Sequence, residues 1–531
     1  MQVSKFLKGT MILLAAGLIT RVLGFINRIV IARFIGEEGV GLYMMAFPTF
    51  ILVITITQLG LPVAISKHVA EAEAIGDRAK IKKILVVSLA TTITLSVIFT
   101  PILLLIAPML AQTIFTDSRT LYPLLAIAPI VPIIAISSVI RGYFQGKQNM
   151  KPAALSQLIE QGVRIALIAF ITKAFLPYGI EYAAAAAMFS SVIGELASLL
   201  YLVTTFKLKK KFPVRKQFFS FLKTGKGTFQ ELMSIALPTT GSRMIGSISW
   251  FFEPIVVAHA LAIAGVATIM ATKQYGALTG FALPLLMLPS FVTNSLSTSL
   301  VPAISEANSQ NNMKLVEYRL QQALRFVFIS GGLAIVVLYI LADPLMEVMY
   351  GSTSGAQFIK LMAPFFLLHY CQAPLQATLQ ALNLARAAMI NSLIGAVVKT
   401  AVIFLLASQP AFGINGVAMG LLVGFILVTF LHFATIIKSI SFSFYVRDYV
   451  KTIFVMVASG ILGNWVFFNL PPMQPLSIKV LIVTTLVSVV YIILVLILGL
   501  LHKDELNRIP WIGHILAKLS IFGQPHSTTK R

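Results

Sequence analysis

Apolar stretches long enough to cross a membrane recur along almost the whole chain. A hydrocarbon core about 30 Å thick needs about 20 apolar residues in a helix that rises about 1.5 Å per residue. Stretches of this kind cover residues 8–34, 40–63, 83–110, 120–141, 153–176, 181–206, 231–260, 270–302, 322–342, 356–381, 384–408, 413–438, 449–470 and 477–501. The pattern therefore predicts an all-α polytopic membrane protein with about 14 transmembrane helices.

Basic residues gather on alternate connections between these predicted helices. Lys and Arg are frequent at both ends of the chain and within 67–83, 141–151, 207–230 and 438–451. The opposite connections hold Arg33, Arg119, Lys173, Lys273 and Lys479. Because cytoplasmic loops of membrane proteins are enriched in Lys and Arg, we expect a cell-membrane protein with both termini in the cytoplasm. An even number of helices is then required, and fourteen satisfies that requirement.

The longest polar interruption, residues 207–230, is also the most basic. It follows six predicted helices, which is typical of a linker between two halves. We therefore predict an N-terminal six-helix lobe at 1–206, a basic cytoplasmic linker at 207–230, a C-terminal six-helix lobe at 231–438, an extra helix pair at 439–501 and a cytoplasmic tail at 502–531.

Short matches between the two halves indicate an internal repeat. Arg21 and Gly24 in the first predicted helix are echoed by Arg243 and Gly246 in the seventh. The sequence LPVAIS at 61–66 is similar to LVPAIS at 300–305. Six helices followed by six in the same orientation form a parallel repeat, and such repeats place the substrate site between the two lobes. We expect a central cavity there.

The composition supports the membrane assignment and narrows the class of partner. The chain has 531 residues, of which 58% are hydrophobic and 11% are charged, whereas soluble domains carry about 25% charged residues. The net charge of +23 follows from the basic cytoplasmic loops, so we predict membrane lipids but no nucleic acid as partners. The single cysteine, Cys371, excludes an intrachain disulfide and is expected to be a buried filler.

Five basic residues lie deep inside predicted helices, where a charge costs about 2.5–3.5 kcal/mol. They are Arg21, Arg28, Arg164, Arg243 and Lys399. Arg21 and Arg28 are seven residues apart, which places them on one face of a helix, and Arg243 is the repeat equivalent of Arg21. Because guanidinium groups bind phosphate oxygens in pairs, we expect these three to bind a phosphate or pyrophosphate. The alternative is that each of these arginines has a structural role and bonds to helix carbonyls or to a buried acid.

Three acidic residues also lie deep in the predicted helices. Glu160 stands four residues before Arg164, a spacing that favours an ion pair within one helix. Glu253 shares a face with Arg243 and precedes Pro254, so it could line the path or carry a proton. Glu195 is interpreted as a packing residue. The predicted substrate-binding residues are therefore Arg21, Arg28, Arg243, Glu253, Arg164, Lys399 and Glu160.

Chemical motifs of an enzyme are missing from the sequence. The seven histidines are scattered, and neither an HExxH motif nor a Walker A loop is present. We therefore predict no catalytic residues, no metal site and no cofactor. Transport would be powered by an ion gradient, the membrane potential or a substrate gradient. The last two helices have no counterpart in the repeat. They would add an apolar groove for a lipid tail, or widen the scaffold.

Several runs of residues resemble one transporter superfamily. These are Arg21-Val22-Leu23-Gly24-Phe25, the stretch 32–43, Gly60-Leu61-Pro62-Val63-Ala64-Ile65-Ser66-Lys67, Arg141-Gly142-Tyr143-Phe144-Gln145-Gly146, Leu296-Ser297 and 300–306. They resemble the multidrug/oligosaccharidyl-lipid/polysaccharide (MOP) exporter superfamily and, within its polysaccharide and lipid-flippase branch, the stage V sporulation protein B family. The resemblance covers essentially the whole chain. It implies two six-helix lobes around a central cavity, and transport of a lipid-linked peptidoglycan precursor during spore cortex synthesis.

The function predicted from the sequence is therefore flippase-like transport. The substrate would be an undecaprenyl-pyrophosphate-linked saccharide, a peptidoglycan precursor for the spore cortex. One alternative is a cation-coupled exporter of small amphipathic compounds, which would have acidic rather than basic cavity residues. A second alternative is a non-transporting scaffold with cell-wall synthases as partners, in which cavity charges could be replaced without loss.

Overall fold

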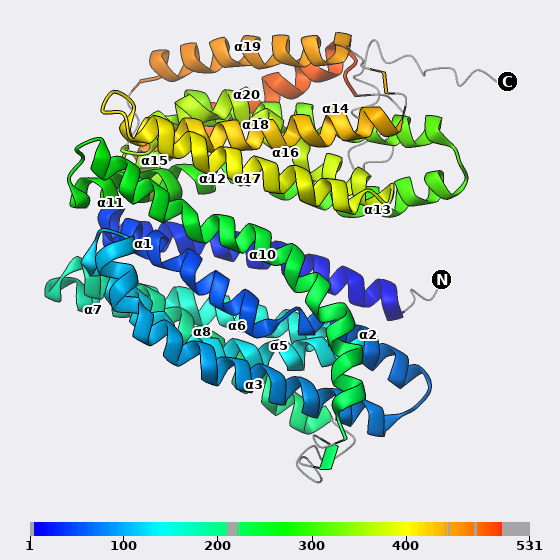
Figure 1. Cartoon of the computed structure of the whole chain (residues 1–531). Helices are drawn as coiled ribbons and strands as arrows, with labels where there is room; N and C mark the ends of the chain where they lie inside the picture. Colours follow the sequence, from blue (N-terminus) through cyan, green and yellow to red (C-terminus); the bar gives the residue numbers. More distant parts are fainter. Residues whose placement is uncertain are drawn as a thin grey trace. The chain divides into compact units, whose positions relative to one another are not determined.

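The computed structural model describes residues 5–209, 220–221, 224–440, 442–443, 446–471 and 475–501, and every regular element in these ranges is helical (Figure 1). This confirms the predicted all-α class. Most of the predicted basic linker, 210–219 and 222–223, and the predicted tail at 502–531 lie outside the described residues. The chain forms two compact units. The first contains Met1–Phe281 and Ile403–Gly416, and the second Ala282–Val402 and Val417–Arg531.

The first unit holds the helices up to α11. Its main elements are α1 (Lys5–Gln58), α2 (Leu61–Ala74), α3 (Arg78–Met109), η2 (Ser118–Thr120), α4 (Leu121–Ile127), α5 (Ile130–Gly146), α6 (Met150–Leu167), α7 (Lys173–Phe175), α8 (Ile180–Lys209), α10 (Lys226–Ile263) and α11 (Thr268–Gly276). α10 and α11 follow residue 230 and yet group with this unit. The compact units therefore do not coincide with the predicted lobes, and the division into lobes at 207–230 stays a prediction.

The second unit holds most of the later helices. They are α12 (Leu283–Met287), α13 (Ser290–Ser309), α14 (Met313–Ile340), α15 (Ala342–Tyr350), α16 (Ala356–Ala381), α17 (Ala385–Ala407), α18 (Gly413–Ser439), α19 (Val446–Asn469) and α20 (Leu476–Ile497). The connection between α17 and α18 groups with the first unit.

The first two predicted spans are separated by a break at Gly36. Its φ of 63° lies in the left-handed region, which a residue with a side chain rarely adopts, so the helical hydrogen-bond ladder is interrupted there. A straight helix as long as α1, 54 residues, would extend about 80 Å, far beyond one hydrocarbon core. The break falls between the predicted spans 8–34 and 40–63.

The number of membrane spans is close to the predicted one. Within the described residues, 11 helices are long and apolar enough to cross a membrane, or 12 when Thr268–Met287 and Ser290–Ser309 count as one bent span. One of these runs, Gly17–Ala74, contains the Gly36 break, and α16 is not among them. Fourteen spans are compatible with this arrangement, and the exact count stays a prediction.

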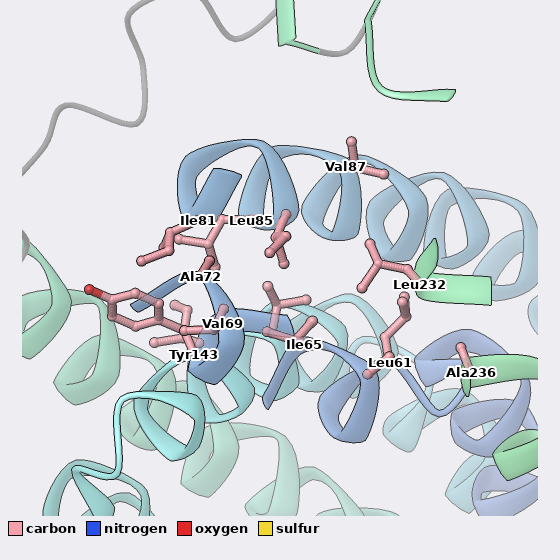
Figure 2. Close-up of a cluster of buried hydrophobic side chains, with 14 of the residues drawn as sticks. Leu61, Ile65, Val69, Ala72, Ile81, Leu85, Val87, Tyr143, Leu232 and Ala236 are labelled. Carbon is pink, nitrogen blue, oxygen red and sulfur yellow. The ribbon is translucent and has the colours of Figure 1, made fainter. Parts of the chain in front are cut away.

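A buried apolar cluster joins α2 to its neighbours in the first unit. Leu61, Ile65 and Val69 recur at helical spacing on one face of α2. Figure 2 shows them with Leu85 of α3 and Leu232 of α10 around the same space. This packing fixes the start of α10 against α2 and α3, so the first unit holds α10 by side-chain contacts as well as by the chain connection.

The last two helices pack on α14 in the second unit. Val480, Val483 and Val487 of α20 are buried against Val336 of α14. The Tyr491 hydroxyl of α20 donates a hydrogen bond of 2.9 Å to the Ile329 carbonyl of the same helix α14. A buried phenol needs such a partner, so this bond supports the helix contact. The extra helix pair is therefore an integral part of the second unit.

Candidate functional site

A small polar cavity lies between α1 and α6 in the first unit. Its volume is about 180 Å³. Arg28 and Asn27 line it from α1, and Gln161 and Arg164 line it from α6. Tyr43 and Phe47, whose rings stack 5.7 Å apart, add an aromatic wall. Two predicted substrate-binding residues, Arg28 and Arg164, thus share one cavity.

Three polar atoms on the lining residues of this cavity lack a hydrogen-bond partner in the described part of the chain. They are the side-chain oxygens of Asn27 and Gln161 and the Nε atom of Arg164. Asn27 is only 6% exposed. Because buried polar groups are nearly always hydrogen-bonded, these atoms mark positions where a water molecule or a ligand can bind, with donors to the amide oxygens and an acceptor to the guanidinium.

A cluster of charged residues adjoins the cavity. Arg164 forms an ion pair with Glu160 on the same helix, as the spacing predicts. The Nη2 atom of Arg141, on α5, lies 3.6 Å from Glu160 Oε2 and 3.1 Å from Glu195 Oε1, on α8. Arg141 also donates hydrogen bonds to the hydroxyl groups of Ser156 and Ser198. Glu160 and Glu195, which share one nitrogen of Arg141, are called the carboxylate pair below.

The interpretation of Glu195 as a packing residue is wrong. Its side chain is 2% exposed and is bound to Arg141, 54 residues away in the sequence. The neighbouring Gly194 makes this possible, because a Cβ atom there would lie 2.8 Å from the Glu160 carbonyl oxygen. A larger residue would push α8 away from α6. The sequence held a signal for this pair: Glu195 lies deep in a predicted helix and has no basic residue one turn away, so its partner had to come from another helix.

The other predicted site residues lie elsewhere. Arg21 on α1 and Arg243 on α10 are exposed side chains of the first unit. Glu253 is buried on α10 and interacts electrostatically with Tyr275 of α11. Lys399 belongs to the second unit, where its side chain packs close to Gly424 of α18. That Arg21, Arg28 and Arg243 face one cavity stays a prediction.

A polar latch joins α1, η2 and α11 in the first unit. Arg119 pairs with Glu38 of α1 and donates two hydrogen bonds, of 3.0 and 2.9 Å, to Asp117. The Thr272 hydroxyl of α11 donates to the same carboxylate over 2.8 Å. Burial alone would raise the pKa of Asp117. The hydrogen bonds from Arg119 and Thr272 outweigh that effect, so its pKa lies below the ordinary value.

A large apolar groove runs along α14, α16 and α19 in the second unit. Its volume is about 1120 Å³, and Leu476 at the start of α20 is among its lining residues. Carbon-rich side chains form most of its wall, and Asp343 and Lys360, which form an ion pair, lie among the lining residues. An apolar groove beside the last two helices, one of the two alternatives for them, is therefore present, and its use by a lipid tail stays a prediction. We call it the α19 groove.

Comparisons with known proteins find two family profiles and several similar proteins. Two family profiles match it, described as polysaccharide biosynthesis protein over residues 6–308 and as MatE over residues 273–405. Stage V sporulation protein B of Bacillus subtilis (strain 168) is 60% identical over 97% of this chain and 99% of its own length. The lipid II flippase MurJ of the same organism is 26% identical over 96% and 98%.

The fold has a counterpart among solved structures. A lipid II flippase MurJ in an inward closed conformation aligns with a TM-score of 0.65 at 15% identity, over 90% of this chain and 97% of that chain. At this identity the likeness shows the fold alone. It agrees with the all-helical architecture and with the many apolar spans.

Proposed function

Because the chain belongs to the polysaccharide biosynthesis protein family and is a multi-pass membrane protein, we propose that it is a lipid flippase. Its substrate is an undecaprenyl-pyrophosphate-linked saccharide, a peptidoglycan precursor for the spore cortex. Stage V sporulation protein B and the lipid II flippase MurJ, both similar over nearly the whole chain, support this choice. Both termini lie in the cytoplasm under this proposal.

The polar cavity of the first unit carries the proposal. Arg28 and Arg164 supply two guanidinium groups, which bind phosphate oxygens and stay charged at every physiological pH. The unpartnered amide oxygens of Asn27 and Gln161 accept hydrogen bonds from sugar hydroxyl or amide groups. A few directional contacts of this kind select the pyrophosphate-sugar head.

The α19 groove suits the lipid part of the substrate. A polyprenyl chain is long, apolar and free of hydrogen-bonding groups. It can therefore pack against a wall of mostly apolar side chains without leaving a polar group unpaired. Membrane lipids would fill the groove when no substrate is present. The groove thus supports a lipid-linked substrate rather than a free sugar.

The two alternatives differ from this proposal in what the cavity charges do. A cation-coupled exporter of small amphipathic compounds would have acids facing the ligand, whereas the charged residues that line the described cavity are arginines. A non-transporting scaffold would tolerate the loss of those arginines.

Complementation of a strain that lacks this protein tests the proposal. Wild type, Arg28→Ala and Arg28→Lys are expressed at matched membrane abundance, and cortex peptidoglycan and lipid-linked precursor are quantified. Losing a charge-assisted bidentate contact of about 1.5–3 kcal/mol should lower transport about tenfold or more, so precursor accumulates and cortex is lost. Arg28→Lys keeps the charge and should be intermediate.

Lys67→Ala is the control, because this lysine is an exposed member of a surface ion pair with Glu71. It should restore the cortex fully. Full restoration by Arg28→Ala as well, with no precursor accumulating, would contradict the flippase and favour the scaffold. Arg21→Ala and Arg243→Ala, measured in the same way, test whether those two arginines take part.

A further inference from the structure

The charged cluster beside the cavity is balanced, with two guanidinium groups and two carboxylates. Arg141 holds Glu195 and touches Glu160, and Arg164 holds Glu160. Ionised groups in the membrane interior need such partners, because removing one partner leaves an uncompensated buried charge. The balance therefore lasts only while both arginines stay with the carboxylate pair.

The Arg164 guanidinium could bind a second partner, a ligand in the cavity, instead of Glu160. Its side chain lines the cavity together with Arg28, and its Nε atom lacks a partner within the described structure. The unpartnered Asn27 oxygen on the same cavity indicates, independently, a ligand at this place. An anion in the cavity would draw the Arg164 guanidinium toward it, away from Glu160.

The loss of Arg164 would change the chemistry of the carboxylate pair. One guanidinium, that of Arg141, would then face two carboxylates that already share its Nη2 atom. Two nearby carboxylates with insufficient positive charge cannot both stay ionised, and one of them takes up a proton. The hydroxyl groups of Ser156 and Ser198 are neutral and do not replace the missing charge.

We propose that the carboxylate pair is a proton-binding site that takes up one proton when Arg164 engages an anionic ligand in the cavity. One carboxylate and one proton become one carboxylic acid, and no other bond forms or breaks. The charged groups that face the pair are Arg141 of α5 and Arg164 of α6. Arg28 of α1 lies across the same cavity. The identity of the anion rests on the proposed function, but the proton site does not.

Proton and anion binding are then linked in both directions. If the anion promotes proton uptake, acid must promote anion binding by the same factor. Over the pH range in which the pair titrates, affinity should rise up to about tenfold for each unit by which the pH falls. Substrate that arrives on one side of the membrane would thus bring a proton with it.

Proton uptake on ligand addition tests this directly. The full chain, purified in detergent in weak buffer, receives farnesyl pyrophosphate as the probe, and a pH dye reports bound protons. Wild type should take up about one proton per probe bound. Glu160→Gln and Glu195→Gln should bind the probe without proton uptake and with an affinity that no longer depends on pH.

Glu73→Gln is the matched control, because Glu73 also pairs with a basic residue distant in the sequence, Lys147 directly after α5, but is itself exposed. It should keep the wild-type proton uptake. Probe binding by wild type without proton uptake would overturn the inference, and so would uptake that survives unchanged in Glu160→Gln and Glu195→Gln.

An infrared titration without any probe separates this inference from the proposed function. The carboxylic acid carbonyl band should appear on acidification in wild type and shrink in Glu160→Gln and Glu195→Gln. Arg164→Gln, which removes one cation, should make the band appear at higher pH. If the band behaves so but the probe never binds, the pyrophosphate proposal fails and the proton site stands. If no band of the pair titrates, the proton site fails.

Discussion

The cavity of the first unit and the α19 groove of the second are opposites in size and chemistry. The cavity has about 180 Å³ and several polar side chains, whereas the groove has about 1120 Å³ and a wall that is mostly hydrocarbon. In a membrane, lipid tails are as apolar as leucine, so burying a tail in the groove gains little from the hydrophobic effect. Under the proposed function, selectivity would therefore come from the cavity, and the groove would accommodate the tail by shape.

The ion pairs in the two units differ in the same way. Asp117 of the polar latch is 4% exposed and is held by Arg119 and Thr272. Asp343 and Lys360, among the residues of the groove, are 52% and 46% exposed. Buried charges depend on their partners, and exposed ones hardly do. The four predictions below test these contrasts.

The largest expected effect is that of Arg119→Ala on stability. The change leaves Asp117 buried with Thr272 as its main partner, and losing one member of a buried pair costs about 3–5 kcal/mol. The free energy of unfolding, measured with sodium dodecyl sulfate in mixed micelles, should fall by about 3 kcal/mol. A double variant, Arg119→Ala with Asp117→Asn, should recover part of this loss. A decrease of less than about 1 kcal/mol would contradict this and show that the ion pairs of the latch are solvated.

The pH dependence of the same measurement checks the role of Asp117. The pKa of Asp117 in the folded protein is lower than in the unfolded chain. Its contribution to stability is therefore complete above the unfolded pKa, and is lost as the pH falls through the lower, folded value. Wild type should lose stability in strong acid, and Asp117→Asn should lose less over the same range.

The second prediction concerns Gln161→Met in the cavity. Methionine has about the same length but offers no strong acceptor, so a sugar donor that pairs with the Gln161 oxygen would lose its partner. Affinity for a pyrophosphate-linked sugar should fall about tenfold, whereas affinity for inorganic pyrophosphate should be unchanged. Equilibrium binding to the purified protein measures both. Gln409→Met, at an exposed position, is the control. An equal loss for both ligands would contradict sugar recognition by Gln161.

The third prediction concerns Gly460→Phe in the α19 groove. A Cβ atom at Gly460 would meet only Ile340 Cδ1, at 3.9 Å, so a side chain can start there without a clash, and Gly460 lines the groove. Lost contacts with a long tail should cost about 1 kcal/mol, or about fivefold in undecaprenyl pyrophosphate binding. Farnesyl pyrophosphate, with a shorter chain, should bind almost as before. Val450→Phe, exposed on the same helix, should change neither.

Helix positions could be predicted from the sequence because length and hydropathy determine them almost alone. The predicted span 384–408 coincides with α17 (Ala385–Ala407), and 413–438 with α18 (Gly413–Ser439). The ion pair of Glu160 and Arg164 was also predictable, because its partners lie one helical turn apart.

The rest of the site depends on contacts between helices. Arg141 and Glu195 meet only because α5 and α8 pack together, and Gly194 allows α8 to approach α6. No periodicity in one helix contains that information. The volume of the α19 groove likewise depends on how side chains of α14, α16 and α19 fit together, whereas its apolar character follows from the sequence of α19.

The smallest expected effect is that of Lys360→Ala, and it decides whether the groove has a polar entrance. Exposed ion pairs contribute about 0–1 kcal/mol, so stability should change by less than about 0.5 kcal/mol. If the pair does nothing more, undecaprenyl pyrophosphate should bind Lys360→Ala as well as wild type. If Lys360 instead contacts the ligand's phosphate groups, affinity should fall several-fold at unchanged stability, and Lys360→Arg should restore it. That second outcome would remove the difference in chemistry between the cavity and the groove, because the groove would then also recognise charge.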